Sequence, residues 1–259
     1  MDVLIELVLG FVLGFLIGLT GVGGGALAAP VLYVVLGLDY AESVALSLLY
    51  SLFTKLFSAV QHSRQHSVLW PVTLLYGLTG IPGAVLGSWV VYWASSAVQR
   101  TFPFIMGGVL MTVSLFIVLE GALRSLPMRP VPISPHHITW RSVLGVALFQ
   151  LFVGVLMGIT SIGAGSLIIL SMIYFFRMSA REIVGSNIVI ALIMVAPASL
   201  THYASAGVDW RLLGVLTVGS LGGAILGSKL TLVMPERGLK LVIAVLILVG
   251  AVATIAKAW

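Results

Sequence analysis

The second half of this sequence repeats the first half at a constant offset of 140 residues, without a gap. Three pairs of uncommon residues meet in this register: Glu42 and Glu182, His62 and His202, and Trp70 and Trp210. An apolar composition produces chance matches of Leu and Gly, but it does not explain this agreement of Glu, His and Trp. A long internal repeat predicts two copies of one structural unit. We expect the units at residues 1–120 and 140–259, joined by a Pro-rich and Arg-rich linker at 121–139.

Long apolar runs separated by short polar links fill both units. Only 8% of the 259 residues are charged and 60% are hydrophobic, whereas a soluble domain carries about 25% charged residues. The sequence therefore predicts an all-α polytopic membrane protein. The net charge of +5 is then explained by topology signals in the loops rather than by nucleic-acid binding. The chain has no cysteine, which excludes disulfides and cysteine-ligated metals.

Each unit is expected to hold a broken or re-entrant helical hairpin followed by three spanning helices. In the first unit the hairpin consists of residues 3–20, a glycine cluster and residues 26–37, and the spanning helices lie at about 43–60, 69–95 and 101–119. The second unit follows the same layout from about residue 141, with 166–177 as its short piece. A helix of 12 residues reaches only about 18 Å, against a hydrocarbon core of about 30 Å. We also expect residues 3–20 to remain in the mature protein, because Asp2 and Glu6 replace the basic region of a signal peptide.

The basic residues of the loops indicate how the units are oriented. If each hairpin returns to its own side, nine lie on one face and three on the other, whereas a single crossing of the broken helix divides the same twelve evenly. The positive-inside rule favours the first arrangement. It predicts an inverted-topology repeat with the 121–139 linker in the cytoplasm and both termini outside. Two complete crossings per hairpin sort the charges in the same way, so re-entrant and very short spanning pieces both stay open. The nine are Arg64, Arg124, Arg129, Arg141, Arg177, Arg181, Lys229, Arg237 and Lys240, and the three are Arg100, Arg211 and Lys257.

The glycine cluster at residues 20–25 and its copy at 160–166 are the predicted substrate site. Irregular backbone in hydrocarbon needs protein or a watery cavity around it, and glycine allows close approach to a ligand and a positive φ. The helix that follows offers free N–H groups at its positive end, which favours an anion. The predicted substrate-binding residues are Thr20, Gly21, Gly23, Gly24, Gly25, Ser47, Lys55, Thr160, Ser161, Gly163, Gly165, Ser166 and Asn187.

Several of these patterns also have a structural explanation. Glycines at four-residue spacing, such as Gly83 and Gly87, are more typical of close helix packing. Lys55 either pairs with the anion or extends its charged end to the interface. His62 and His202 are weak candidates for proton coupling because histidine titrates near neutrality, and an interfacial position explains them as well. No metal and no cofactor are expected.

The form G-x-G-G-G-x-L-x-x-P-x-L of residues 21–32, its degenerate copy at 161–172 and the duplicated layout resemble the TauE/SafE family. This family comprises the sulfite exporter-like permeases of the 4-toluenesulfonate uptake permease superfamily. The resemblance implies a secondary transporter for sulfite, sulfoacetate or other sulfonates in the bacterial inner membrane. A sulfo group would suit convergent N–H and hydroxyl donors. The second copy departs from the pattern at Ser161, Ala164 and Leu170, so the two half-sites should contribute unequally.

We therefore expect a permease that works by alternating access between the repeats. The alternatives are an anion channel with the same glycine-lined filter, or a permease for another small organic anion. An enzyme is not expected, because the chain lacks a Cys nucleophile, a His-Glu-x-x-His helix and paired intramembrane aspartates. The expected partners are a small anionic substrate, membrane lipid and a proton or other coupling ion, without nucleic acid. A homodimer stays open.

Overall fold

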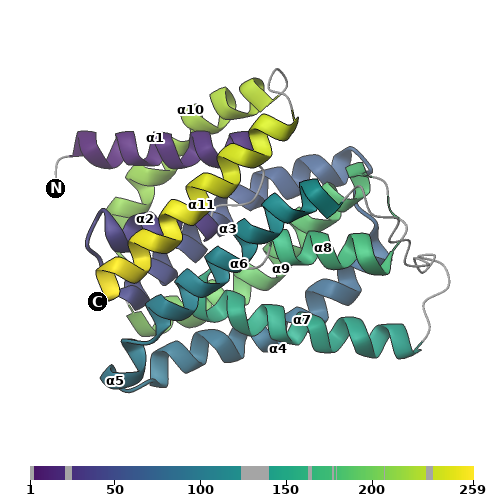
Figure 1. Cartoon of the computed structure of the whole chain (residues 1–259), viewed down its shortest axis with the longest axis horizontal. Coiled ribbons are helices and arrows are strands. Elements are labelled where there is room, and N and C mark those ends of the chain that lie inside the picture. The colour runs from purple at the N-terminus through teal and green to yellow at the C-terminus, as the bar shows by residue number, and fades with distance from the viewer. Residues whose placement is uncertain are drawn as a thin grey trace.

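The computed structural model describes residues 3–20, 25–123, 140–162, 165–176, 178, 180–206, 208–231 and 236–259. Within these ranges the chain forms eleven helices (Figure 1), which confirms the all-helical prediction. The first six are α1 (Val3–Thr20), α2 (Gly25–Val34), α3 (Tyr40–Arg64), α4 (Trp70–Trp93), α5 (Ser96–Gln99) and α6 (Phe102–Leu123). The other five are α7 (Trp140–Thr160), α8 (Ser166–Phe175), α9 (Ala180–Ala206), α10 (Trp210–Thr231) and α11 (Glu236–Ala258).

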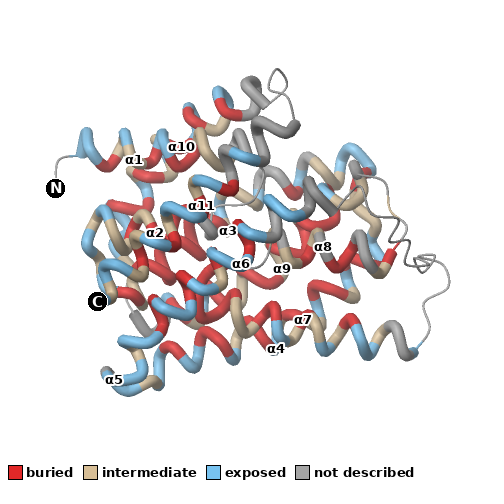
Figure 2. Tube along the Cα trace, in the orientation of Figure 1, coloured by how far each residue is buried: buried red, intermediate tan, exposed pale blue. Residues whose placement is uncertain are grey.

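The outer surface of the helices is apolar. Four stretches of the described chain are long and apolar enough to cross a membrane: Trp70–Trp93, Val143–Thr160, Glu182–Tyr203 and Trp210–Gly227. Figure 2 shows exposed residues along the outward sides of α1, α4 and α7, and the exposed large apolar side chains of these helices include Leu4, Leu78 and Leu148. An apolar belt of this extent is unfavourable in water and suits the hydrocarbon core of a bilayer.

The helices begin with residues that suit a membrane boundary. Trp70, Trp140 and Trp210 are the first residues of α4, α7 and α10, and each is exposed. Indole rings at such positions favour the interface between lipid and water. Glu42 and Glu182 lie in the first turns of α3 and α9, where a carboxylate meets the positive end of the helix dipole.

The helices α2 and α8 are the short pieces predicted from the sequence. Each has ten residues and reaches about 15 Å, half the thickness of the hydrocarbon core. Tyr33, near the end of α2, contacts Lys257 near the end of α11. The end of α2 therefore lies at the end of the molecule where α1 begins and α11 ends (Figure 1), which we call the terminal face.

Both short helices also pack against neighbouring helices. Phe176, directly after α8, packs on Tyr76 in the first third of α4, with ring centroids 5.9 Å apart. Pro30 inside α2 lies against Gly250 of α11, where a Cβ atom would be 3.7 Å from the proline ring. This contact agrees with a packing role for Pro30 rather than a ligand role.

Close backbone packing joins α1 to α10. A Cβ atom added to Gly10 would lie 2.5 Å from the carbonyl oxygen of Leu216, and one added to Gly14 would lie 2.2 Å from that of Ser220. The two helices therefore touch backbone to backbone, as small residues at four-residue spacing allow. Residue numbers rise together along both helices, so α1 and α10 run parallel.

The pair α4 and α7 packs in the same way. A Cβ atom at Gly83 would lie 2.1 Å from the carbonyl oxygen of Leu151, and one at Gly87 would lie 2.2 Å from that of Val155. The predicted packing role of these glycines is confirmed. At the 140-residue offset α7 corresponds to α1 and α10 to α4, so the two parallel pairs are equivalent under the repeat. Between these pairs, α3 packs against α9 in the interior, where buried residues concentrate (Figure 2).

Candidate functional site

The break between α7 and α8 places a buried, unpaired hydroxyl group inside the molecule. Ser161 directly follows α7 and has a φ of 61°, in the left-handed region that side chains other than glycine rarely adopt. Ser161 is only 5% exposed, and its Oγ has no hydrogen-bond partner in the described part of the chain. A buried polar group without a partner costs about 1–3 kcal/mol. Strained backbone and an unpaired hydroxyl together are typical of a position that binds a ligand.

Thr160 shapes this break. Its Oγ1 donates to the carbonyl oxygen of Leu156 at 2.6 Å and accepts the N–H of Ile162 at 3.1 Å. The hydroxyl proton of Thr160 therefore goes to the main chain of α7. In this conformation Thr160 holds the turn in which Ser161 lies, rather than offering a proton to a substrate.

The described glycine of the second break does not need its special conformational freedom. Gly165 precedes α8 with a φ of −108°, whereas Ser161 of the same break is left-handed. Gly25 is the first residue of α2. Gly21, Gly23, Gly24 and Gly163 lie outside the described residues, as do the side chains of Thr20 and Ser166. Their roles stay predictions.

The two predicted histidines differ in their surroundings. His202 on α9 is 1% exposed, and its Nε2 lies 2.8 Å from the carbonyl oxygen of Gly158. A carbonyl only accepts, so Nε2 carries the proton. His202 is therefore buried between α9 and α7, and it contacts α7 two residues before the end of that helix.

His62 lies at the end of α3 and closes the loop to α4. The hydroxyl of Ser67 donates to the His62 carbonyl at 3.0 Å, and the His62 Nδ1 lies 2.9 Å from the same Oγ, so Nδ1 donates to it. Proton coupling through either histidine stays a prediction. Within the described ranges, no group of three or more acidic or histidine side chains could hold a metal ion.

One face of α3 carries a row of hydroxyl groups, which we call the hydroxyl face. Its members recur at three- and four-residue spacing, which places them on one side of a helix, and they are Tyr40, Ser43, Ser47, Tyr50, Ser51 and Thr54. All are buried except Thr54, which is partly buried. Among the described residues, the Oγ of Ser43 has no hydrogen-bond partner.

Only Ser47 of this face was among the predicted site residues. Its hydroxyl donates within the helix, to the carbonyl oxygen of Val44 at 3.0 Å. The sequence carried a signal for the other members, namely hydroxyl residues at helical spacing inside an apolar segment. Such a polar row in a membrane interior is a sign of a path for a polar substrate.

Asn187 and Lys55 are both placed on central helices. Asn187 of α9, the repeat equivalent of Ser47, is buried, and its Oδ1 has no hydrogen-bond partner within the described ranges. Lys55 is partly buried and lies about 80° around α3 from Ser47. Lys55 makes no ion pair within the described part of the chain. Its two predicted roles therefore both remain open.

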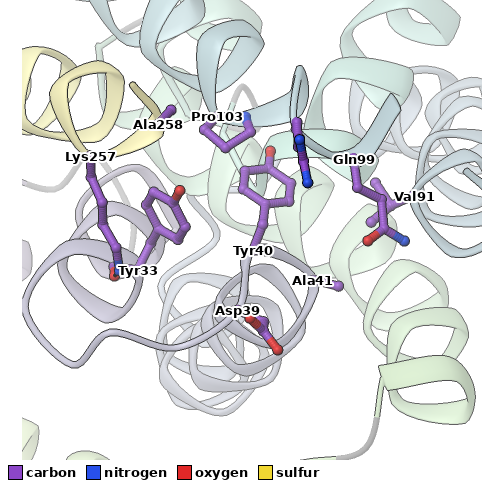
Figure 3. Close-up of a pocket in the computed structure, with 10 residues that line it drawn as sticks. Tyr33, Asp39, Tyr40, Ala41, Val91, Gln99, Pro103, Lys257 and Ala258 are labelled. Atoms are coloured by element: carbon purple, nitrogen blue, oxygen red, sulfur yellow. Dashed lines mark hydrogen bonds between the residues drawn. The ribbon is translucent and has the colours of Figure 1, made fainter. Parts of the chain in front are cut away.

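A cavity of about 600 Å³ opens near the end of α11. Its polar lining residues are Tyr33, Asp39, Tyr40, Gln99, Arg100 and Lys257, and none of the predicted site residues lines it. Figure 3 shows Tyr40 between Tyr33 and Gln99. Sequence reasoning missed this cavity, although Arg100 and Lys257 are two of the three basic residues assigned to the sparsely charged face.

The fold and the site define a multi-pass helical membrane protein whose helices are interrupted in the interior. The chain belongs to the TauE/SafE family, because residues 6–254 match the family described as "Sulfite exporter TauE/SafE". This confirms the resemblance seen in the sequence.

The relatives are named as transporters. The chain is 32% identical to the probable membrane transporter protein YjnA of Bacillus subtilis (strain 168), covering 94% of this chain and 96% of that protein. It is 26% identical to the probable membrane transporter protein YunE of the same organism, covering 96% of both chains. A probable membrane transporter protein of Xylella fastidiosa is 24% identical, covering 93% and 90% of the two chains. No solved structure gives a significant match. The protein is a membrane transporter of the TauE/SafE family.

Proposed function

We propose that this chain is a secondary transporter for small anions that carry a sulfo group, such as sulfite, sulfoacetate and other organosulfonates. The observation that carries the proposal is the buried, unpaired hydroxyl of Ser161 at a strained helix break. The description of the family as sulfite exporters supports the sulfo group as the recognised chemistry.

The chemistry of the break suits an oxyanion. The first N–H groups of α8 have no acceptor within their helix, and the dipole makes this end positive. Ser161 adds a hydroxyl donor, and Ser43 on the hydroxyl face of α3 carries a second hydroxyl without a partner among the described residues. Three sulfo oxygens accept several hydrogen bonds at once, and each is strengthened by the negative charge.

Alternating access between two inverted repeats is the mechanism that we propose. The parallel packing of α1 with α10, and of α4 with α7, supports a two-fold relation between the units. The helices α1 and α7 begin at opposite ends of the molecule (Figure 1), as inversion of one unit requires. In such transporters one repeat moves against the other around a fixed central site.

We further propose that the protein lies in the bacterial inner membrane with the 121–139 linker in the cytoplasm and both termini outside. The distribution of nine and three basic residues supports this orientation. It makes the terminal face the outer face.

Flux into proteoliposomes tests the proposal. Purified protein would be reconstituted, and uptake of labelled sulfite and sulfoacetate measured with and without a pH gradient. We expect saturable uptake that responds to the gradient. Linear, passive flux would support an anion channel with the same filter, and uptake of simple carboxylates alone would support a permease for another organic anion. The absence of any sulfo-anion flux under every gradient would overturn the proposal.

A further inference from the structure

The cavity on the terminal face brings together two basic side chains, Arg100 and Lys257. Among the described residues of this face, the basic ones are Arg100, Arg211 and Lys257. Arg211 forms an ion pair with the buried carboxylate of Glu6, with Nη1 and Oε1 3.3 Å apart. The other two both line the cavity. The two basic side chains of this face that have no carboxylate partner among the described residues therefore lie together at the cavity.

The two cations are held differently. The Nζ of Lys257 donates to the carbonyl oxygen of Tyr33 and lies 4.2 Å from the centroid of the Tyr33 ring. These two contacts hold the ammonium group in place. Arg100 is exposed and makes no ion pair within the described residues. Asp39 is the acidic residue of the lining, so the cavity keeps an excess of one positive charge.

The cavity has the size and donors to hold a small organic anion. A volume of about 600 Å³ lies within the usual range for ligand sites. A planar guanidinium such as that of Arg100 binds two oxygens of a sulfonate or carboxylate at once. The Nε2 of Gln99 donates to the carbonyl oxygen of Ala94 at 3.2 Å, which fixes this amide at the rim.

Tyr40 lines the cavity and also contacts the end of α7 at the second helix break. The hydroxyl of Tyr40 donates to the carbonyl oxygen of Ile159 at 2.8 Å, one residue before Thr160. The Tyr40 ring packs between Tyr33 and Phe102, with centroid distances of 6.1 and 5.7 Å. Tyr40 also begins the hydroxyl face of α3. The cavity therefore lies beside both features on which the proposed function depends.

We propose that this cavity is a loading site, in which a small sulfonate or carboxylate binds Arg100 and Lys257 at the terminal face before it passes Tyr40 toward Ser161. This inference rests on the proposed function and adds a second, peripheral site to it. The site acts on anions presented from the terminal face. Anions presented from the opposite face meet it only after the break.

Protection of a single cysteine tests the loading site directly. The chain has no cysteine of its own, and Ala41 lines the cavity, so Ala41→Cys gives one reporter. A membrane-impermeant maleimide would label it in proteoliposomes, with sulfoacetate or acetate added on the same side. We expect either anion to slow labelling. Arg100→Gln should raise the protecting concentration about tenfold, because a charge-assisted contact is lost.

Matched controls make the outcome decisive. Arg64→Gln removes an exposed arginine from the other end of α3 and should leave protection unchanged. Arg100→Lys keeps the positive charge, so its protection should be stronger than that of Arg100→Gln. Ala258→Cys, also in the lining, provides a second reporter if Ala41→Cys does not fold. Equal protection with Arg100→Gln and Arg64→Gln would overturn the loading site. Protection by an anionic phospholipid but by neither small anion would also overturn it.

The loading site and the proposed function fail in different ways. Sulfo-anion flux without cysteine protection would remove the loading site and leave the transporter. Protection without any flux would keep an anion site in the cavity and remove the transport proposal.

Discussion

Ser161 concentrates the chemistry of the break in one residue. It combines a left-handed backbone with a buried hydroxyl that has no partner, and a folded protein keeps such a combination when the position has a use. Thr160 next to it satisfies its own hydrogen bonds within the main chain. The sequence could not show which of the two hydroxyl groups is available to a ligand, because this depends on the conformation of the turn.

Replacement of Ser161 by glycine should separate strain from binding. Glycine adopts a positive φ without steric cost, so Ser161→Gly should keep or slightly raise the melting temperature. Loss of the hydroxyl should raise the KM for sulfoacetate about tenfold. Ser114→Ala on α6, whose hydroxyl donates to the carbonyl oxygen of Ala244, serves as the control and should leave KM unchanged. A wild-type KM for Ser161→Gly would remove this hydroxyl from the site.

Bulk at the glycines of the two breaks should block transport. A leucine at Gly24 or Gly165 would fill the space through which backbone N–H groups reach the anion. We expect Gly24→Leu and Gly165→Leu each to abolish measurable flux while the protein still purifies as a monodisperse species. Gly145→Leu is the matched control, because a Cβ atom there meets nothing within 4 Å. Wild-type transport with either break variant would remove the backbone-binding proposal.

At the scale of elements, most helices follow from the apolar pattern. The first helix ends at Thr20 as expected, and α4 covers Trp70–Trp93 against the predicted 69–95. The helix α3 runs from Tyr40 to Arg64, several residues beyond the predicted 43–60, because polar residues at its ends continue the helix. The helix α2 ends at Val34, and Gly37 follows with a φ of 71°. The cavity could not be predicted, because it is formed by the ends of helices far apart in sequence.

The parallel pair of α4 and α7 should depend on the absence of a single methyl group. A Cβ atom at Gly158 would lie 2.3 Å from the carbonyl oxygen of Ala84 and 2.5 Å from the N–H nitrogen of Ser88, so the two backbones would have to separate. Gly158→Ala should lower the free energy of unfolding by about 2–3 kcal/mol. Unfolding by SDS titration would measure the change. Gly145→Ala on the same helix, where a Cβ atom meets nothing within 4 Å, should leave the free energy of unfolding unchanged or raise it slightly, because alanine favours a helix more than glycine does. Equal stability of the two variants would contradict the packing described for this pair.

At the scale of the whole molecule, the repeat accounts for the equivalent helix pairs, while the charge distribution sets the proposed orientation. Labelling from each side of the membrane tests that orientation. A cysteine at Ser95, exposed after α4, should react with an impermeant maleimide from outside intact cells. A cysteine at Gln65, exposed after α3, should react only after permeabilisation, because the two positions lie at opposite ends of α4. Reaction of both from outside would contradict the proposed topology.

Counterflow tests the central claim most directly. Proteoliposomes loaded with unlabelled sulfoacetate would be diluted into a trace of labelled sulfoacetate, and the label inside followed with time. A carrier with one site open alternately to the two sides should accumulate label transiently above its equilibrium level, because the unlabelled anion leaving returns the site to the outside. Label that rises steadily to equilibrium without an overshoot would contradict alternating access and favour a channel.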